Sequence, residues 1–127
     1  MKKIIIIPTY NEKKNITKLI NKIFKLYKSD FDVLVVDDNS PDKTLNEVIK
    51  LKKKYKFLKY LKRNKKLGIG SAHKDAILNS YKKKYDLIIT MDSDGTHDPI
   101  YIKKMTNKIK KYDLIITNRF KKKKFSV

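Results

Sequence analysis

Residues 88–94 have the sequence Ile-Ile-Thr-Met-Asp-Ser-Asp, an apolar run that ends in two carboxylates one residue apart. If residues 88–91 form a buried strand, Asp92 and Asp94 leave its carboxyl end on the same side, because strand side chains repeat with period two. Open α/β sheets bind their ligands at that edge. Two acids placed there favour a hard divalent cation that also holds phosphate groups.

Similar apolar runs recur along the chain and alternate with amphipathic segments. The runs are rich in Ile, Val and Leu and mostly lack polar alternation, which is typical of strands covered on both faces. We expect strands at residues 3–7, 32–37, 57–61, 86–92 and 113–117, and helices near residues 16–27, 41–51, 71–81 and 99–110. This order predicts an α/β fold with a mostly parallel sheet and helices on both faces.

The second of these helices has a well-marked start in the sequence. Ser40 is a good capping residue, Pro41 suits the first helical position, and Asp42 suits the positive end of the helix dipole. We therefore expect this helix to begin at Pro41.

The composition limits the possible classes of protein. With 127 residues and 40% hydrophobic residues, the chain can bury a core, so disorder is not expected. The absence of cysteine excludes a disulfide scaffold and a thiolate metal site. No apolar stretch is long enough to cross a bilayer. We expect one domain over residues 1–120, followed by a basic tail at residues 121–127.

The formal charge of +20 has two interpretations, which the sequence leaves open. Of the 33 basic residues only Arg63 and Arg119 are arginine, so the lysine excess is consistent with a general compositional bias. Alternatively, the charge attracts anionic partners such as nucleotide diphosphates, acidic lipid headgroups or nucleic acid. Nucleic acid is the least expected of these, since acids gather at the edge where a ligand would bind and no base-stacking module is evident.

Three segments follow strands and should meet at the carboxyl edge of the sheet. They are residues 8–12 (Pro-Thr-Tyr-Asn-Glu), 36–42 (Val-Asp-Asp-Asn-Ser-Pro-Asp) and 92–99 (Asp-Ser-Asp-Gly-Thr-His-Asp-Pro). An aromatic ring and acids there suit a nucleoside, although strand exits and helix caps explain part of each pattern. His97 alone is more typical of a loop hydrogen bond than of a metal ligand. A fourth, glycine-bearing basic segment at residues 62–72 enters a helix and suits phosphate.

Taken together and in order, these motifs resemble family 2 glycosyltransferases, and within them most closely the dolichol-phosphate or polyprenol-phosphate mannose synthases. The resemblance includes the Ser-Pro-Asp turn, the Lys-Leu-Gly-Ile-Gly segment at residues 66–70, the His-Pro pair after the acids, and residues 113–116 leading to Arg119. It covers nearly the whole chain. It implies a Rossmann-like GT-A fold that binds a nucleotide sugar.

The resemblance also implies roles for individual residues. The nucleoside would be held by Pro8, Tyr10, Glu12, Val36 and Asp38. Mg²⁺ or Mn²⁺ and the diphosphate would be held by Asp92, Ser93 and Asp94, with Thr96 as a further oxygen ligand where relatives have Gln or Ser. Arg119 would contact the donor phosphates, and Asp92, Asp94 and Arg119 would form the catalytic set.

The implied reaction is inverting transfer of mannose from GDP-mannose to a polyprenyl or dolichyl phosphate. Because that acceptor is a lipid, the chain is expected in the cytoplasm, peripherally attached to the cytoplasmic face of a membrane. Relatives continue well beyond Arg119. The resemblance therefore implies that this chain is the N-terminal, donor-binding part, whose missing half or partner subunit supplies the acceptor site.

Three alternatives remain open from the sequence. One is another family 2 transferase, for example one that moves glucose to a polyprenyl phosphate. A second is a truncated domain that binds the donor without turnover. A third is a phosphatase, because Asp92-Ser93-Asp94-Gly95-Thr96 also matches the D-x-D-G-T signature whose first acid is a nucleophile.

Overall fold

Strands and helices alternate along the part of the chain that the structure, a computed structural model, describes, namely residues 1–117. The elements, in chain order, are β1 (Lys3–Thr9), α1 (Lys13–Tyr27), β2 (Asp32–Asp37), α2 (Thr44–Lys52), β3 (Leu58–Lys62), α3 (Ile69–Lys82), β4 (Leu87–Thr90), the 3₁₀ turn η1 (Pro99–Tyr101), α4 (Ile102–Lys108) and the 3₁₀ turn η2 (Ile109–Lys111).

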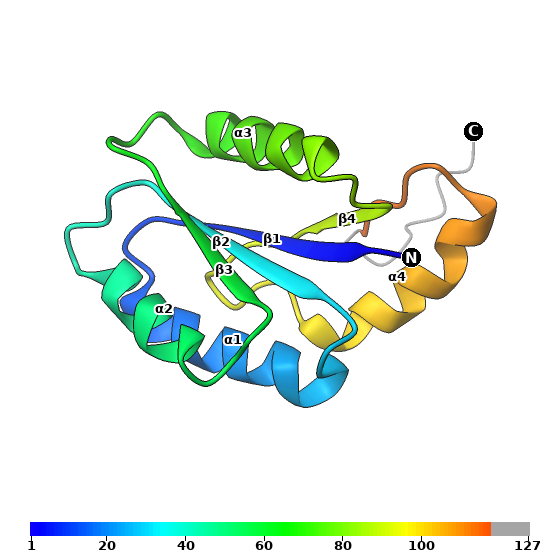
Figure 1. Ribbon diagram of the computed structural model, residues 1–127, viewed down its shortest axis with the longest axis horizontal. Coiled ribbons are helices and arrows are strands. Elements are labelled where there is room, and N and C mark those ends of the chain that lie inside the picture. The colour runs from blue at the N-terminus through cyan, green and yellow to red at the C-terminus, as the bar shows by residue number, and fades with distance from the viewer. Residues whose placement is uncertain (118–127) are drawn as a thin grey trace, which may run out of the picture.

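The four strands form one parallel sheet in the order β3-β2-β1-β4. Figure 1 shows α3 on one side of the sheet and α1, α2 and α4 on the other. The predicted α/β architecture with a parallel sheet covered on both faces is confirmed. All the carboxyl ends of the strands therefore point to one edge, where the loops after β1, β2 and β4 meet.

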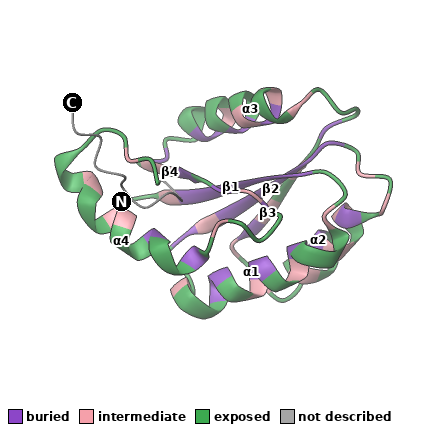
Figure 2. Ribbon diagram, turned by 180° about the vertical axis from the view of Figure 1, so that it is seen from behind, coloured by how far each residue is buried: buried purple, intermediate pink, exposed green. Residues whose placement is uncertain are grey.

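Two apolar layers, one on each face of the sheet, explain the run of four isoleucines at residues 4–7. Ile5 and Ile7 are buried beneath α1 and α2, whereas Ile4 and Ile6 are buried beneath α3. Figure 2 shows the buried strands between their covering helices. A strand that is enclosed on both sides has no solvent face, so its sequence lacks polar alternation.

The start of α2 differs from the prediction. The helix begins at Thr44 rather than Pro41, and Lys43 at its N-cap has a left-handed backbone with φ 65°. The Ser40 hydroxyl donates to Asp37 at 2.5 Å and accepts from the Asn11 N–H at 3.0 Å, so it is not available as a cap. In the polar turn at residues 38–43, Ser40 therefore makes hydrogen bonds that hold the loop, and the helix begins only at Thr44.

The predicted strand at residues 113–117 is wrong. These residues are not in a regular element, and Leu114 and Ile116 are 74% and 81% exposed. A run with high strand propensity forms a strand only when it finds a neighbour to pair with, and here it does not pair with β4. The expected basic tail at residues 121–127 lies outside the described residues, and the division into a domain and a tail stays a prediction.

Helices long and apolar enough to span a bilayer are absent from residues 1–117.

Candidate functional site

A cavity of about 240 Å³ opens at the carboxyl edge of the sheet, between the loops after β1, β2 and β4 and the start of α3. Seven residues that the sequence nominated line it: Pro8, Tyr10, Glu12, Asp38, Asp92, Ser93 and Asp94. The fold thus brings together residues more than 80 positions apart in the chain. The other lining residues are Thr9, Lys66, Gly68, Ile69 and Ala72.

Two nominated residues among those that the structure describes do not line this cavity, and a third, Arg119, lies outside them. The Val36 side chain is fully buried in the core on the α3 side of the sheet. Thr96 lies at a second hollow, between β4 and α4, and its hydroxyl donates to Asp94 Oδ1 at 2.6 Å. Thr96 is therefore placed to orient Asp94.

Asp92 and Asp94 reach the cavity through a tight turn rather than along a strand. Because β4 ends at Thr90, the period-two argument used for them is wrong, although both acids line the same cavity. Asp94 Oδ1 also accepts from the Thr96 N–H at 2.9 Å, and Gly95 has φ 86°, which favours glycine. This turn fixes where the second acid is presented.

His97 contacts both the backbone N–H and the carboxylate of Asp92. Its Nδ1 accepts from the Asp92 N–H at 2.9 Å, and its Nε2 lies 3.5 Å from Asp92 Oδ2. When the imidazole is neutral, this arrangement leaves the ring proton on Nε2, facing the carboxylate. His97 acts here as a loop hydrogen-bonding residue, in keeping with the more ordinary of its two interpretations.

Ser93 joins the third loop to the first. Its buried hydroxyl donates to the Pro8 carbonyl at 3.1 Å. The two loops therefore hold a fixed spacing across the floor of the cavity.

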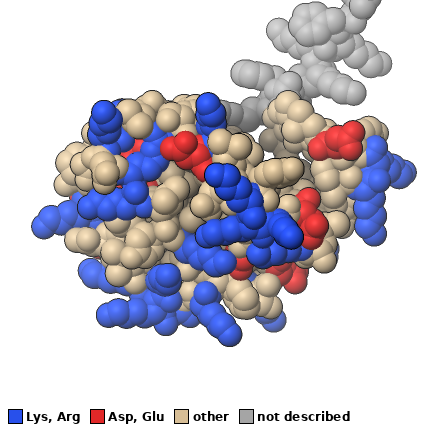
Figure 3. Space-filling view, turned by 45° about the horizontal axis from the view of Figure 1, so that its top comes forward, with Lys and Arg blue, Asp and Glu red and all other residues tan. Residues whose placement is uncertain are grey.

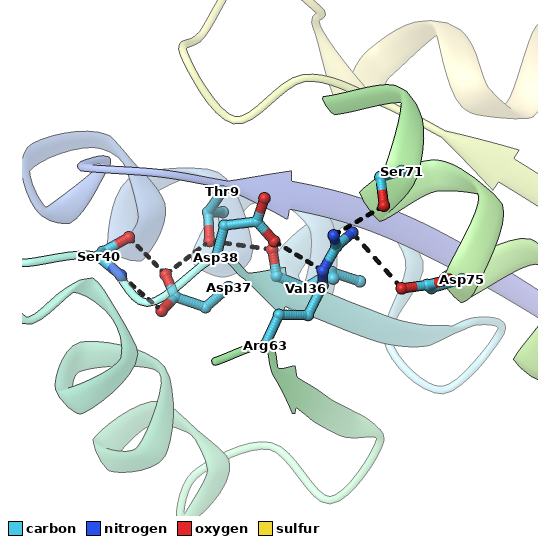
Figure 4. Close-up of polar contacts among 8 residues, drawn as sticks. All are labelled: Thr9, Val36, Asp37, Asp38, Ser40, Arg63, Ser71 and Asp75. Atoms are coloured by element: carbon cyan, nitrogen blue, oxygen red, sulfur yellow. Dashed lines mark hydrogen bonds and ion pairs between the residues drawn. The ribbon is translucent and has the colours of Figure 1, made fainter. Parts of the chain in front are cut away.

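Asp37 and Asp38 differ in their surroundings, as Figure 4 shows. Asp37 is 1% exposed, and its carboxylate accepts from the Ser40 N–H at 3.1 Å and the Thr9 hydroxyl at 3.2 Å. It therefore shapes the loop, helped by Asn39, whose φ of 59° is the left-handed conformation that asparagine tolerates. Asp38, in contrast, lines the cavity.

Arg63 is a central residue of this edge that sequence reasoning missed. It follows β3, its side chain is 6% exposed, and its Nε lies 3.1 Å from Asp38 Oδ1. A second nitrogen donates to the Ser71 hydroxyl at 2.8 Å, and Nη1 lies 3.6 Å from Asp75 Oδ2 (Figure 4). Arg63 thus ties the Asp38 carboxylate to α3. Its signal in the sequence was its rarity, as one of two arginines among 33 basic residues, directly after a strand.

Arg63 and Asp38 lie close together, but their buried polar atoms are not all hydrogen-bonded. Within the described part of the chain, Asp38 Oδ1 and Arg63 Nη1 are buried without a hydrogen-bond partner. The ion pair compensates the two charges through proximity alone. Removal of the Arg63 charge would therefore leave the Asp38 carboxylate buried without its cation, whereas Arg63 would keep Asp75 nearby if Asp38 were removed.

The basic segment before α3 folds over the first loop. Lys66 Nζ lies 4.2 Å from the centre of the Tyr10 ring, a cation–π contact. Behind it, Gly68 adopts φ 94° at the N-cap of α3, which has no side-chain cap. The first N–H groups of α3 therefore begin at the cavity wall without a side-chain acceptor, an arrangement that suits a phosphate group.

Asp42 locks the second loop to the helices on either side of it. Its Oδ1 accepts from the Thr44 N–H at 2.9 Å, and its Oδ2 accepts from the Lys13 N–H at 3.1 Å. Burial pushes the pKa of the Asp42 carboxyl upward, but these bonds and the Thr44 hydroxyl outweigh it and lower the pKa below 3.8.

We expect Asp42→Ala to lower the free energy of unfolding by about 1 kcal/mol at neutral pH, as for a lost helix cap. A carboxyl whose pKa is lower in the folded than in the unfolded protein stabilises the fold at pH values above its unfolded pKa. This stabilisation is lost as the pH falls through the folded pKa. The difference between the two proteins should therefore shrink below pH 3.8. Urea unfolding at several pH values measures it. A difference that is constant between neutral and acidic pH would contradict this role.

The charges around the cavity fit a divalent cation. Four carboxylates line it, from Glu12, Asp38, Asp92 and Asp94; Lys66 is the basic residue among the lining residues, and Arg63 is paired with Asp38. A diphosphate would be repelled by the acids unless a cation lay between them. Among residues 1–117 there is no group of three or more His, Cys, Asp and Glu residues that could hold a metal ion. This donor set matches Mg²⁺-type sites, in which one or two carboxylates act together with waters and substrate phosphates.

Comparison with known proteins gives a consistent picture. The family model described as "Glycosyl transferase family 2" matches residues 4–126. The dolichol-phosphate mannosyltransferase of Pyrococcus furiosus is 35% identical over 125 residues, which cover 96% of this chain and 34% of that protein. The chain therefore spans about a third of the length of that curated relative.

Two solved structures share the fold. The mannosyltransferase PcManGT from Pyrobaculum calidifontis, in complex with GDP-Man and Mn²⁺, is 25% identical with a TM-score of 0.66, over 73% of this chain and 27% of that one. S. aureus TarS (residues 1–349), in complex with UDP, is 32% identical with a TM-score of 0.71, over 89% of this chain and 33% of that one.

Proposed function

This chain belongs to glycosyl transferase family 2, and from that premise we propose that it binds the donor of a metal-dependent, inverting hexosyl transfer. The donor proposed is GDP-mannose and the acceptor a polyprenyl or dolichyl phosphate. The similarity to a dolichol-phosphate mannosyltransferase and to a mannosyltransferase in complex with GDP-Man and Mn²⁺ supports this choice.

The observation that carries the proposal is the meeting of three loops around one cavity. Tyr10 and Asp38, from the first and second loops, line it together with Asp92 and Asp94 from the third. In the proposed complex the nucleoside occupies the part formed by Pro8, Tyr10, Glu12 and Asp38. Lys66 must then leave one face of the Tyr10 ring, or the base must use the other face.

Asp92 and Asp94 are the residues that would hold Mg²⁺ or Mn²⁺, with Thr96 and His97 orienting them from outside the cavity. When bound, the cation supplies Lewis-acid stabilisation of the departing diphosphate. The uncapped start of α3 and the Lys66 ammonium add positive potential beside the same phosphates. Arg119 remains a proposed donor-phosphate contact on the resemblance alone.

An acceptor that is a lipid phosphate does not require a strong general base among the residues of this chain. An oxygen of the lipid phosphate attacks the anomeric carbon, the bond from that carbon to the diphosphate oxygen breaks, and the nucleoside diphosphate leaves. A lipid phosphate is already an anion at neutral pH. The nucleophile therefore needs no strong general base, unlike a sugar hydroxyl.

The identity of the nucleotide is tested by a panel of donors. We expect GDP-mannose with Mn²⁺ to raise the thermal unfolding midpoint more than UDP-glucose, UDP-GlcNAc or GDP-mannose with EDTA, because ligand binding stabilises the folded state. The similarity to TarS in complex with UDP favours a UDP-sugar as the second candidate. A larger shift with a UDP-sugar would replace mannose transfer by that candidate.

Binding of the donor without turnover is the other candidate for these 127 residues, because the cavity that they form accounts for the donor alone. Incubation with radiolabelled GDP-mannose, Mn²⁺ and a short polyprenyl phosphate separates the two. Label in the organic phase indicates transfer. Donor binding without labelled lipid would restrict the chain to the donor-binding role.

The lipid acceptor also implies where the chain works. We propose peripheral attachment to the cytoplasmic face of a membrane, supported by the basic surface that Figure 3 shows. Each well-placed lysine contributes about 1 kcal/mol near an anionic leaflet, so attachment should weaken with salt. Flotation with anionic liposomes that salt does not affect would count against it.

A further inference from the structure

The outer side of α3 combines apolar and basic residues. Lys74, Ile77, Leu78, Tyr81 and Lys82 form this surface, which we call the α3 outer face, and all five are exposed. They lie opposite the buried positions of the helix, because residues three, four and seven apart share one side of it. The exposed fractions of Leu78 and Tyr81 are 47% and 76%.

No described helix covers this face. α3 packs on β1, β2 and β4, whereas α1 packs with α2 and η1 on the opposite side of the sheet. Figure 1 shows α3 alone on its side, and Figure 3, which brings that side forward, shows many basic side chains with uncharged surface and a few acidic side chains between them.

The exposed charged residues at the end of α3 are basic. The single acid of the helix, Asp75, is 52% exposed in its side chain, and its Oδ2 lies 3.6 Å from Nη1 of the buried Arg63, which compensates its charge. Three consecutive lysines, Lys82, Lys83 and Lys84, are exposed at the end of the helix and just beyond it. At the other end, Leu67 and Ile69 are 53% and 61% exposed beside the cavity.

From these observations we infer that the α3 outer face is the surface through which the chain contacts an anionic lipid membrane. Lysine stems lie along apolar surface with their ammonium groups at the headgroups, tyrosine favours the interface, and leucine and isoleucine enter the acyl boundary. A second copy of this chain is disfavoured as the occupant, because it carries the same charge of +20.

This inference rests on the proposed function, in which the acceptor is a lipid. It adds the orientation of the chain on the membrane. α3 begins at the cavity wall, with Gly68, Ile69 and Ala72 among the lining residues. A membrane against the outer face of α3 therefore lies within one helix diameter, about 10 Å, of that wall. A phosphate at the lipid surface is then close to the donor.

A tryptophan reporter tests the inference directly, since the chain has no tryptophan. In Leu78→Trp, emission should shift to the blue and be quenched by brominated acyl chains when vesicles of phosphatidylcholine with phosphatidylglycerol are added. Pure phosphatidylcholine should produce neither effect. The matched control is Leu26→Trp on α1, where the leucine is 43% exposed, and its emission should not change.

The lysines give a second readout. Lys74→Gln with Lys82→Gln should lower partitioning to anionic vesicles about thirtyfold, roughly fivefold for each lysine. Lys18→Gln with Lys25→Gln, which are exposed on α1, should have a much smaller effect. Equal effects of the two pairs, or a shift in Leu26→Trp without one in Leu78→Trp, would overturn the inference. So would binding of the chain to anionic vesicles that leaves the Leu78→Trp emission unchanged.

Donor binding, measured on the same samples, separates the two proposals. If Leu78→Trp inserts but no nucleotide sugar binds, the proposed function fails and the membrane contact stands. If GDP-mannose binds and Leu78→Trp does not insert, the membrane contact fails.

Discussion

Arg63→Met is expected to lower the free energy of unfolding by about 3–5 kcal/mol, the usual loss when one partner of a buried ion pair is removed. The side chains of Arg63 and Asp38 are each 6% exposed, so the substitution leaves a buried carboxylate without its cation. Such a loss is a large part of the roughly 5–15 kcal/mol that stabilises a domain. Chemical denaturation followed by circular dichroism measures it.

A double substitution distinguishes a lost ion pair from simple misfolding. Asp38→Leu together with Arg63→Met removes both charges, so much of the stability should return, while nucleotide binding should be lost because Asp38 is a proposed nucleoside contact. Arg63→Lys should be intermediate, because an ammonium keeps the charge but cannot reach both Asp38 and Ser71. A loss below about 1 kcal/mol in Arg63→Met would contradict the role assigned to this pair.

The second large effect is expected at Asp94. Asp94→Asn should weaken Mn²⁺-dependent GDP binding by more than about 100-fold, because loss of even an outer-shell partner of a metal ligand costs about 10- to 100-fold. The amide oxygen can still accept from the Thr96 N–H, so the turn should survive and the fold should not change. Calorimetric titration of GDP in the presence of Mn²⁺ measures the effect.

The matched control is Asp30→Asn, which removes an exposed acid from the loop between α1 and β2, at the opposite edge of the sheet. It changes the net charge by the same amount, so it reports any general electrostatic effect on the anionic ligand. If both variants bound GDP equally well with Mn²⁺, the assignment of Asp94 to the metal would be wrong.

The elements that the sequence predicted well are those whose burial can be inferred from the local pattern of apolar residues. Strand β2 matches the predicted residues 32–37, and Ile4–Ile7 lie in β1, because a strand enclosed on both faces is uniformly apolar. The three loops at the carboxyl edge follow from topology alone, since parallel strands end on the same side. Hence seven nominated residues line one cavity.

The rest depends on side-chain contacts in the folded chain, most of them between residues far apart in sequence, and the local pattern of residues does not encode them. Ser40 has the properties of a helix cap, yet Asp37 and Asn11 engage it, and α2 starts later. Residues 113–117 have strand propensity but no pairing partner among the described strands. Arg63 was missed because its importance comes from Asp38 and Asp75, which lie 25 positions before it and 12 positions after it.

The central claim is that a divalent cation held by Asp92 and Asp94 binds the diphosphate of the donor. Electron paramagnetic resonance of Mn²⁺ with GDP tests it most directly, because Mn²⁺ is itself the probe. The wild-type chain should give a Mn²⁺ spectrum distinct from that of Mn²⁺ and GDP alone, and Asp92→Asn with Asp94→Asn should abolish the difference. A wild-type spectrum identical to that of Mn²⁺ and GDP alone, or an unchanged spectrum in the double variant, would contradict the claim.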